Sequence, residues 1–122
     1  MAITKLNHYA EVQQFIASIL TSNGQSWEGA PHKNFWETLS YNDFVNGNVP
    51  HVKDPDTGSP MPILIKGNSA QSNLILALRG APGTAFDPGS GAIGQMPANG
   101  PPFFTDDQIS SIADWIDRGC PQ

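Results

Sequence analysis

A histidine and two aspartates stand close together in the middle of the chain and have the chemistry of metal ligands. His51, Asp54 and Asp56 fall within one short stretch, and imidazole and carboxylate groups suit divalent ions. The spacing therefore predicts a small metal site, around which a small enzyme is one interpretation. A plain turn is the alternative, because Asp54 to Gly58 is rich in turn-forming residues. The order Asp-x-Asp-x-Gly resembles the start of a calcium loop, but the twelve-residue EF-hand pattern is absent.

Signals for nucleophilic or phosphate chemistry are weak. The one cysteine, Cys120, follows the last expected helix, whereas reactive thiols are activated at helix N-termini. One cysteine also excludes a disulfide within the chain. The residues from 89 to 94 spell Gly-x-Gly-x-x-Gly, but no strand is expected before them and no helix after them. We therefore expect no catalytic activity of the chain's own.

Aromatic side chains concentrate in one part of the chain and offer a candidate binding surface. Trp27, Phe35, Trp36 and Tyr41 lie among asparagines and serines in the stretch 25–48. Exposed aromatic rings of this kind stack on sugars or on a partner protein. The alternative is that the same rings fill the hydrophobic core, as large aromatics usually do.

Periodicity and boundary signals predict a mainly α fold with long loops. Apolar side chains at helical spacing predict a helix that begins after Asn7 and ends near Asn23, and a second over about 70–79. Two short helical turns are expected around residues 35–39 and 41–45. The last helix begins after Thr105, which forms a capping box with Gln108. Residues 49–62 and 81–104 are expected to be loops, and a loop as long as the second is usually functional.

Length and charge narrow the class of protein. The chain has 122 residues, which predicts one domain over 1–122. Six Lys and Arg against eleven Asp and Glu give a net charge of −5, and the cations are scattered, so we expect neither nucleic acid nor an anionic membrane as a partner. No apolar run is long enough to cross a bilayer. The first 19 residues do not resemble a signal peptide, which predicts a cytoplasmic protein unless a leader has been removed.

The second half of the chain resembles a class I cytochrome c domain. The resemblance rests on four stretches, which read IKGNSAQSNL at 65–74, GQMPANGPP at 94–102, TDDQI at 105–109 and WIDRGCP at 115–121. It implies a small helical cytochrome c-like fold, and it implies that Met96 occupies the place of the distal haem ligand. The family's Cys-x-x-Cys-His motif is absent after the first expected helix, where Trp27 stands in place of the histidine. Covalent haem is therefore excluded, and we expect no bound cofactor.

A haem-free version of that fold would need another filling for the haem pocket. A void of a few hundred Å³ would cost on the order of 10 kcal/mol, which is comparable with the whole stability of a domain. We expect either that Trp27, Phe35, Trp36 and Phe44 fill this space or that a different ligand does. Noncovalent haem is one such ligand, with Met96 on one side and His32, which follows the vacated motif, as the replacement proximal ligand.

These observations predict a haem-free cytochrome c-like binding or accessory module with no catalytic activity of its own. Its partner would be another protein or a small ligand, and analogy with the fold places it alongside a redox enzyme. The alternative is an electron-transfer protein that binds noncovalent haem or a soft metal through Met96.

Overall fold

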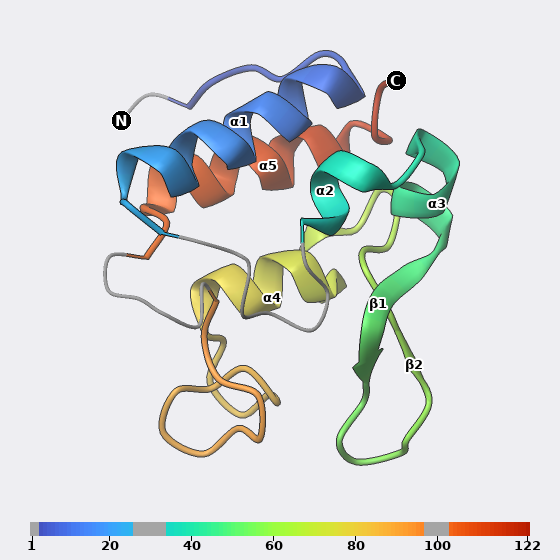
Figure 1. Cartoon of the computed structure of the whole chain (residues 1–122), viewed down its shortest axis with the longest axis vertical. Coiled ribbons are helices and arrows are strands. Elements are labelled where there is room, and N and C mark those ends of the chain that lie inside the picture. The colour runs from blue at the N-terminus through green and yellow to red at the C-terminus, as the bar shows by residue number, and fades with distance from the viewer. Residues whose placement is uncertain (1–2, 26–33, 97–102) are drawn as a thin grey trace.

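The computed structural model describes residues 3–25, 34–96 and 103–122 (Figure 1). In these ranges the chain forms five α-helices, one short 3₁₀ helix and two strands. The helices are α1 (Tyr9–Ser22), α2 (Phe35–Thr38), α3 (Tyr41–Asn46), α4 (Asn73–Arg79) and α5 (Asp106–Asp117), and the 3₁₀ helix is η1 (Ser69–Gln71). The strands β1 (Asn48–Lys53) and β2 (Pro60–Pro62) form an antiparallel pair.

The prediction of a mainly α, cytochrome c-like fold is wrong. The described residues are only 43% helical, and a two-stranded antiparallel sheet stands where the sequence predicted a loop over 49–62. The two strands are joined by a turn in which the Asp54 N–H donates to the Ser59 carbonyl at 2.9 Å. Buried or half-buried Val49, Val52 and Met61 hold this hairpin against the body of the molecule, and their burial stabilises strands that prolines would otherwise disfavour.

Most of the predicted helices are confirmed, and the ends of α3, α4 and α5 carry the expected signals. The Thr105 hydroxyl accepts from the Gln108 N–H, and the Gln108 side chain accepts from the Thr105 N–H, which is the predicted capping box. Ser40 caps α3 by accepting from the Asp43 N–H at 3.2 Å. At α4 the chain leaves the helix through Gly80, which has a φ of 59° and takes the left-handed conformation that glycine favours.

The hydrophobic core lies between the helices, and its centre is aromatic. The ring of Phe44 lies 5.2 Å from that of Tyr9, 5.9 Å from that of Phe35 and 6.3 Å from that of Trp115, measured between centroids. Phe44 and Trp115 are fully buried. Trp115 also donates from its indole N–H to the Pro121 carbonyl at 2.8 Å, so the C-terminal tail is fixed to the same cluster.

The elements are distributed between two ends of the molecule. Figure 1 shows α1 and α5 at one end, whereas the β1–β2 hairpin and the loop that follows α4 extend from the other. No helix of the described part of the chain combines the length and the apolar character that a membrane crossing requires.

Candidate functional site

The hairpin and the loop over 81–96 are joined by a second, smaller apolar cluster. Its buried members are Met61 from the hairpin, Ala77 from α4 and Phe86 from the loop. Four half-buried side chains complete it, namely Val52, Leu76, Ile93 and Met96. We call the structure that this cluster holds together the hairpin–loop end, meaning residues 48–62 and 81–96. The cluster receives side chains from both segments. In Figure 1 the hairpin continues from α3 and the loop from α4, and both extend toward the same end of the molecule.

The loop over 81–96 has its own set of hydrogen bonds. Asp87 accepts from the Gly83 N–H at 3.0 Å through Oδ2 and from the Gly89 N–H at 2.8 Å through Oδ1. These amide donors hold the pKa of the Asp87 carboxyl below its usual range. The Ala85 carbonyl accepts from the N–H groups of Ile93 and Gly94 at 2.8 and 3.1 Å. A loop with this many internal bonds has one defined conformation, which suits it to recognition.

Met96 fixes the end of this loop to α4. Its N–H donates to the Ala77 carbonyl at 2.8 Å, and its half-buried side chain packs against both the main core and the second cluster. Next to it, the Gln95 side-chain amide donates to the Leu78 carbonyl at 3.1 Å. The structure therefore gives Met96 a packing role. His32, the other half of the predicted haem ligand pair, lies outside the described residues.

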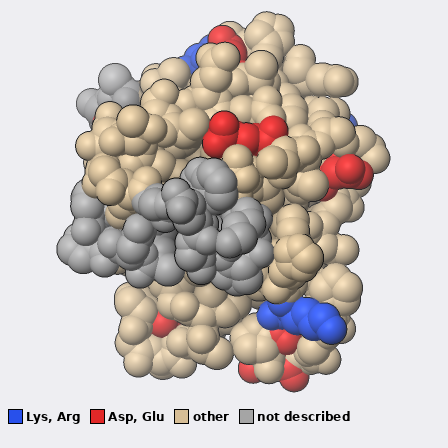
Figure 2. Space-filling view, in the orientation of Figure 1, with Lys and Arg blue, Asp and Glu red and all other residues tan. Residues whose placement is uncertain are grey.

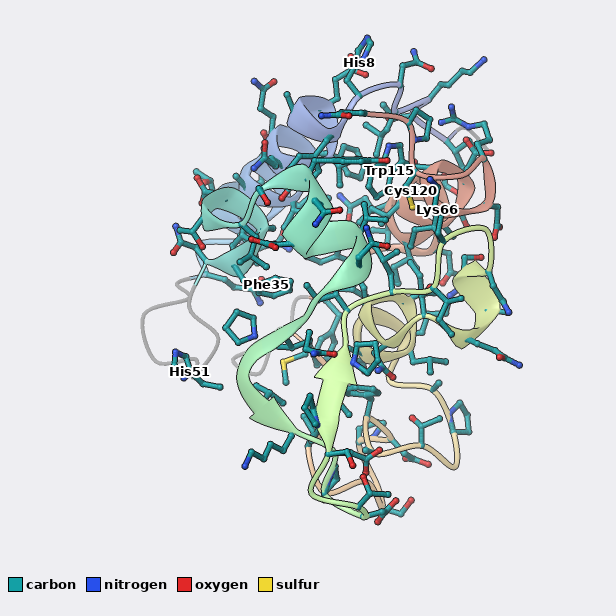
Figure 3. All side chains as sticks on the ribbon, turned by 90° about the vertical axis from the view of Figure 1, so that its right-hand side faces the viewer. His8, Phe35, His51, Lys66, Trp115 and Cys120 are labelled. Carbon is teal, nitrogen blue, oxygen red and sulfur yellow. The ribbon has the colours of Figure 1, made fainter. Side chains whose placement is uncertain are left out.

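His51, Asp54 and Asp56 all lie in or beside the hairpin. His51 is exposed, and Figure 3 shows it on the hairpin, away from the labelled Trp115 and Cys120. Asp54 Oδ1 accepts from the Asp56 N–H at 2.8 Å, so this carboxylate is engaged in the turn. In the part of the chain that the structure describes, no three His, Cys, Asp or Glu side chains come together as metal ligands would. The predicted trio is therefore not gathered into one site.

The hairpin is poorly suited to pairing with a further strand. His51 has a φ of 61° in the middle of β1, and six residues of β1 stand opposite three of β2 between the pairs Asn48–Pro62 and Lys53–Pro60. Such a bulge twists a strand, and prolines remove backbone donors from its edge. β1 contains Pro50, while Pro60 and Pro62 bound β2. A partner of this end would therefore contact side chains and turns rather than extend the sheet.

The described aromatic side chains that the sequence predicted as a binding surface are buried or half-buried. Phe35 and Trp36 are core residues, 8% and 5% exposed, so they offer no stacking surface. Tyr41 is half-buried, and its hydroxyl donates to the Cys120 carbonyl. Trp27 lies outside the described residues. The alternative of core filling holds for Phe35, Trp36 and Phe44, which pack in the main hydrophobic cluster.

Cys120 is buried at the other end of the molecule. Burial raises the pKa of its thiol to about 11, against the opposing effect of the Lys66 ammonium. Figure 3 shows Lys66 and Trp115 beside it. Since the thiolate is the nucleophilic form, this cysteine stays protonated and unreactive at neutral pH.

A shallow groove of about 250 Å³ lies between α1 and α2 and is lined by Ala10, Gln13, Gln14, Ala17 and Glu37. It holds two amides and one carboxylate but no nucleophile, and its small side chains give a ligand little to pack against.

On the face shown in Figure 2, uncharged side chains predominate and acidic groups stand in separate places, with few basic ones. This face has no basic patch of the kind that binds a phosphate backbone.

No protein-family model matches the chain, and no curated protein or solved structure matches it.

Sequence reasoning identified the long loop but missed the residues that shape it. Asp87, Gly91 and Phe86 were not singled out, although an aspartate followed by proline, glycine and serine is a turn signal. The contribution of Met61 was missed for another reason. It stands between two prolines, which concealed the strand that carries it into the second cluster.

Proposed function

We propose that this chain is a binding module without catalytic activity of its own, and that it recognises another protein through the hairpin–loop end. The observation that carries the proposal is the second apolar cluster, which joins the hairpin to the loop over 81–96. It gives two irregular segments a common rigid base. Loops that are positioned by a rigid scaffold are the usual carriers of binding function.

The composition of this end favours a macromolecular partner over a small substrate. Its exposed positions include Thr57 and Pro60 on the hairpin and Pro88 and Ser90 on the loop. The hydroxyls of Thr57 and Ser90 supply hydrogen-bonding groups, and the two prolines supply stiff backbone. Binding through such a preformed surface loses little conformational entropy, because the loop is already ordered. A redox enzyme as the partner remains a prediction from the family resemblance.

A photo-cross-linking experiment tests this assignment. A photoreactive amino acid is introduced at Thr57 or at Ser90, both exposed at the hairpin–loop end, and the protein is irradiated in an extract of cells that encode it. We expect the same partner to be captured from both positions. Matched controls use Thr21 and Ser18, exposed residues of the same types on α1. Equal capture from the controls, or no capture from either test position, would contradict the proposal.

A titration with haem separates this proposal from the electron-transfer alternative. We expect the Soret band of free haem neither to shift nor to sharpen when the purified protein is added, because the Met96 side chain is occupied in packing between the two apolar clusters. The measurement is an absorption spectrum of the wild type and of Met96→Ala. A shift of the Soret band that saturates at one haem per protein and is lost in the variant would overturn the proposal in favour of haem binding.

A further inference from the structure

Asp87 ties together parts of the loop that lie on either side of it. Its carboxylate accepts from Gly83, four residues earlier, and from Gly89, two residues later. Its backbone takes part as well, since the Asp87 N–H donates to Thr84 at 3.1 Å and the Asp87 carbonyl accepts from Gly91 at 2.8 Å. One partly exposed residue is therefore the common partner of both arms of the loop.

The loop is connected to the helical core mainly at its two ends. The Ala81 N–H donates to Leu76 at 3.1 Å where the loop begins, and the Met96 N–H donates to Ala77 where it ends. Between these points the side chain of Phe86 is the buried anchor. A segment of this kind opens locally at lower free energy than the core, because few bonds must break and little apolar surface is exposed.

We propose that Asp87 is the latch of this loop: its carboxylate holds residues 83–94 closed as one unit, and losing it opens the unit without unfolding the helices. This inference rests on the proposed function for its biological meaning, since the loop forms half of the hairpin–loop end. A partner that recognises the closed loop would bind in proportion to the population that is latched. Asp87 thus sets the fraction of molecules whose loop is closed, and it acts as a positioning residue.

The charge on Asp87 is what makes the latch strong. Hydrogen bonds to an ionised acceptor are stronger than those between neutral groups, and the amides of Gly83 and Gly89 keep the pKa of this carboxyl lowered. Asparagine at this position retains one acceptor oxygen but loses the charge. Alanine loses both. The loop amides should therefore be most protected from hydrogen exchange in the wild type, less protected in Asp87→Asn and least protected in Asp87→Ala.

Hydrogen exchange of single amides, followed by NMR on the full chain, tests the latch. The decisive amides are those of Ile93 and Gly94, because they bond to Ala85 and not to Asp87. In Asp87→Ala we expect both to exchange about 10-fold faster or more. In the wild type and the variant alike, both should be less protected than the amide of Ile112, which is fully buried in α5 and exchanges only when the core opens. Asp56→Ala, which removes a carboxylate from the hairpin turn, serves as the matched control and should change neither.

Two results would overturn the latch. If Ile93 and Gly94 exchange within twofold of the wild type, the Asp87 bonds are local and hold no unit closed. If Ile93 and Gly94 are as strongly protected as Ile112, they exchange only when the whole fold opens, and the loop is not a separate unit. Either result leaves the cross-linking test of the proposed function untouched, because that test keeps Asp87, has a probe at Thr57 outside the loop, and asks only what the hairpin–loop end contacts.

Discussion

Replacing Phe44 by alanine should lower the free energy of unfolding by about 3–5 kcal/mol. Phe44 is fully buried, and its ring lies within 5.2–6.3 Å of three other aromatic rings, which come from α1, α2 and α5. Truncation removes all three ring contacts and leaves a cavity at the centre of the core. Because domains of this size are stable by only about 5–15 kcal/mol, the variant should lose a large part of its stability.

Thermal and denaturant unfolding, followed by circular dichroism, measure this effect. We expect the melting temperature to fall by roughly 10–20 °C. Phe15→Ala is the matched control, because Phe15 is the same residue type but only half-buried at the edge of the same core. The free energy of unfolding should decrease clearly less in Phe15→Ala than in Phe44→Ala. Similar losses for the two variants would show that Phe44 is not the centre of the aromatic cluster.

The effect of Phe44 should extend toward the hairpin. α3 leads through Gly47 directly into β1, and the Gly47 carbonyl accepts from the Ile63 N–H at 3.3 Å just after β2. Ile63 in turn accepts from the Leu74 N–H at 2.8 Å at the start of α4. The aromatic core and the base of the hairpin–loop end are therefore linked by a short chain of backbone contacts.

The helices were predictable from the sequence because their determinants are local. The capping box of Thr105 and Gln108 and the cap of Ser40 both lie within three residues of the groups they satisfy. The stripe of apolar side chains on α5 needs no knowledge of its partners to be recognised. For such elements, periodicity and end signals contain nearly all the information that the fold uses.

The hairpin was not predictable in the same way, because its stability is tertiary. β1 and β2 contain prolines and lack a regular alternation, and β2 has only three residues. What holds them is the burial of Val52 and Met61 against Ala77 and Phe86, which come from other parts of the chain. The short stretches that resemble a class I cytochrome c domain all lie after residue 62. They carried no information on the structure of residues 48–62.

The candidate site was predictable only in its location. The density of glycine and proline after Arg79 predicted a long loop over 81–104, and the structure shows that its described part, residues 81–96, has a defined set of hydrogen bonds. Single residues could not be assigned, because the roles of Asp87 and Gly91 depend on where the chain returns to meet itself. Met96 was noticed for its place in a family motif, whereas its observed role is to pack at the junction of the two apolar clusters.

The sharpest requirement in that loop is for a residue without a side chain at position 91. A Cβ atom built on Gly91 would lie 2.2 Å from the Ala85 carbonyl oxygen and 2.7 Å from that of Thr84. Both are backbone atoms, so no rotamer change can relieve the overlap. The Ala85 carbonyl also accepts the hydrogen bonds of Ile93 and Gly94. A displacement of Ala85 would therefore break the bonds that close the loop.

Gly91→Ala should accordingly abolish partner capture from Ser90 and destabilise the protein by about 1–3 kcal/mol, which is the usual cost of overpacking. Gly89→Ala is the matched control, because a Cβ there would meet only Asp87 Oδ1 at 3.5 Å, an ordinary contact. This control should retain both capture and melting temperature. Cross-linking yield and thermal unfolding of the two variants decide the matter. Full capture by Gly91→Ala would mean that the partner does not depend on the closed loop, and binding would then have to be assigned to the hairpin alone.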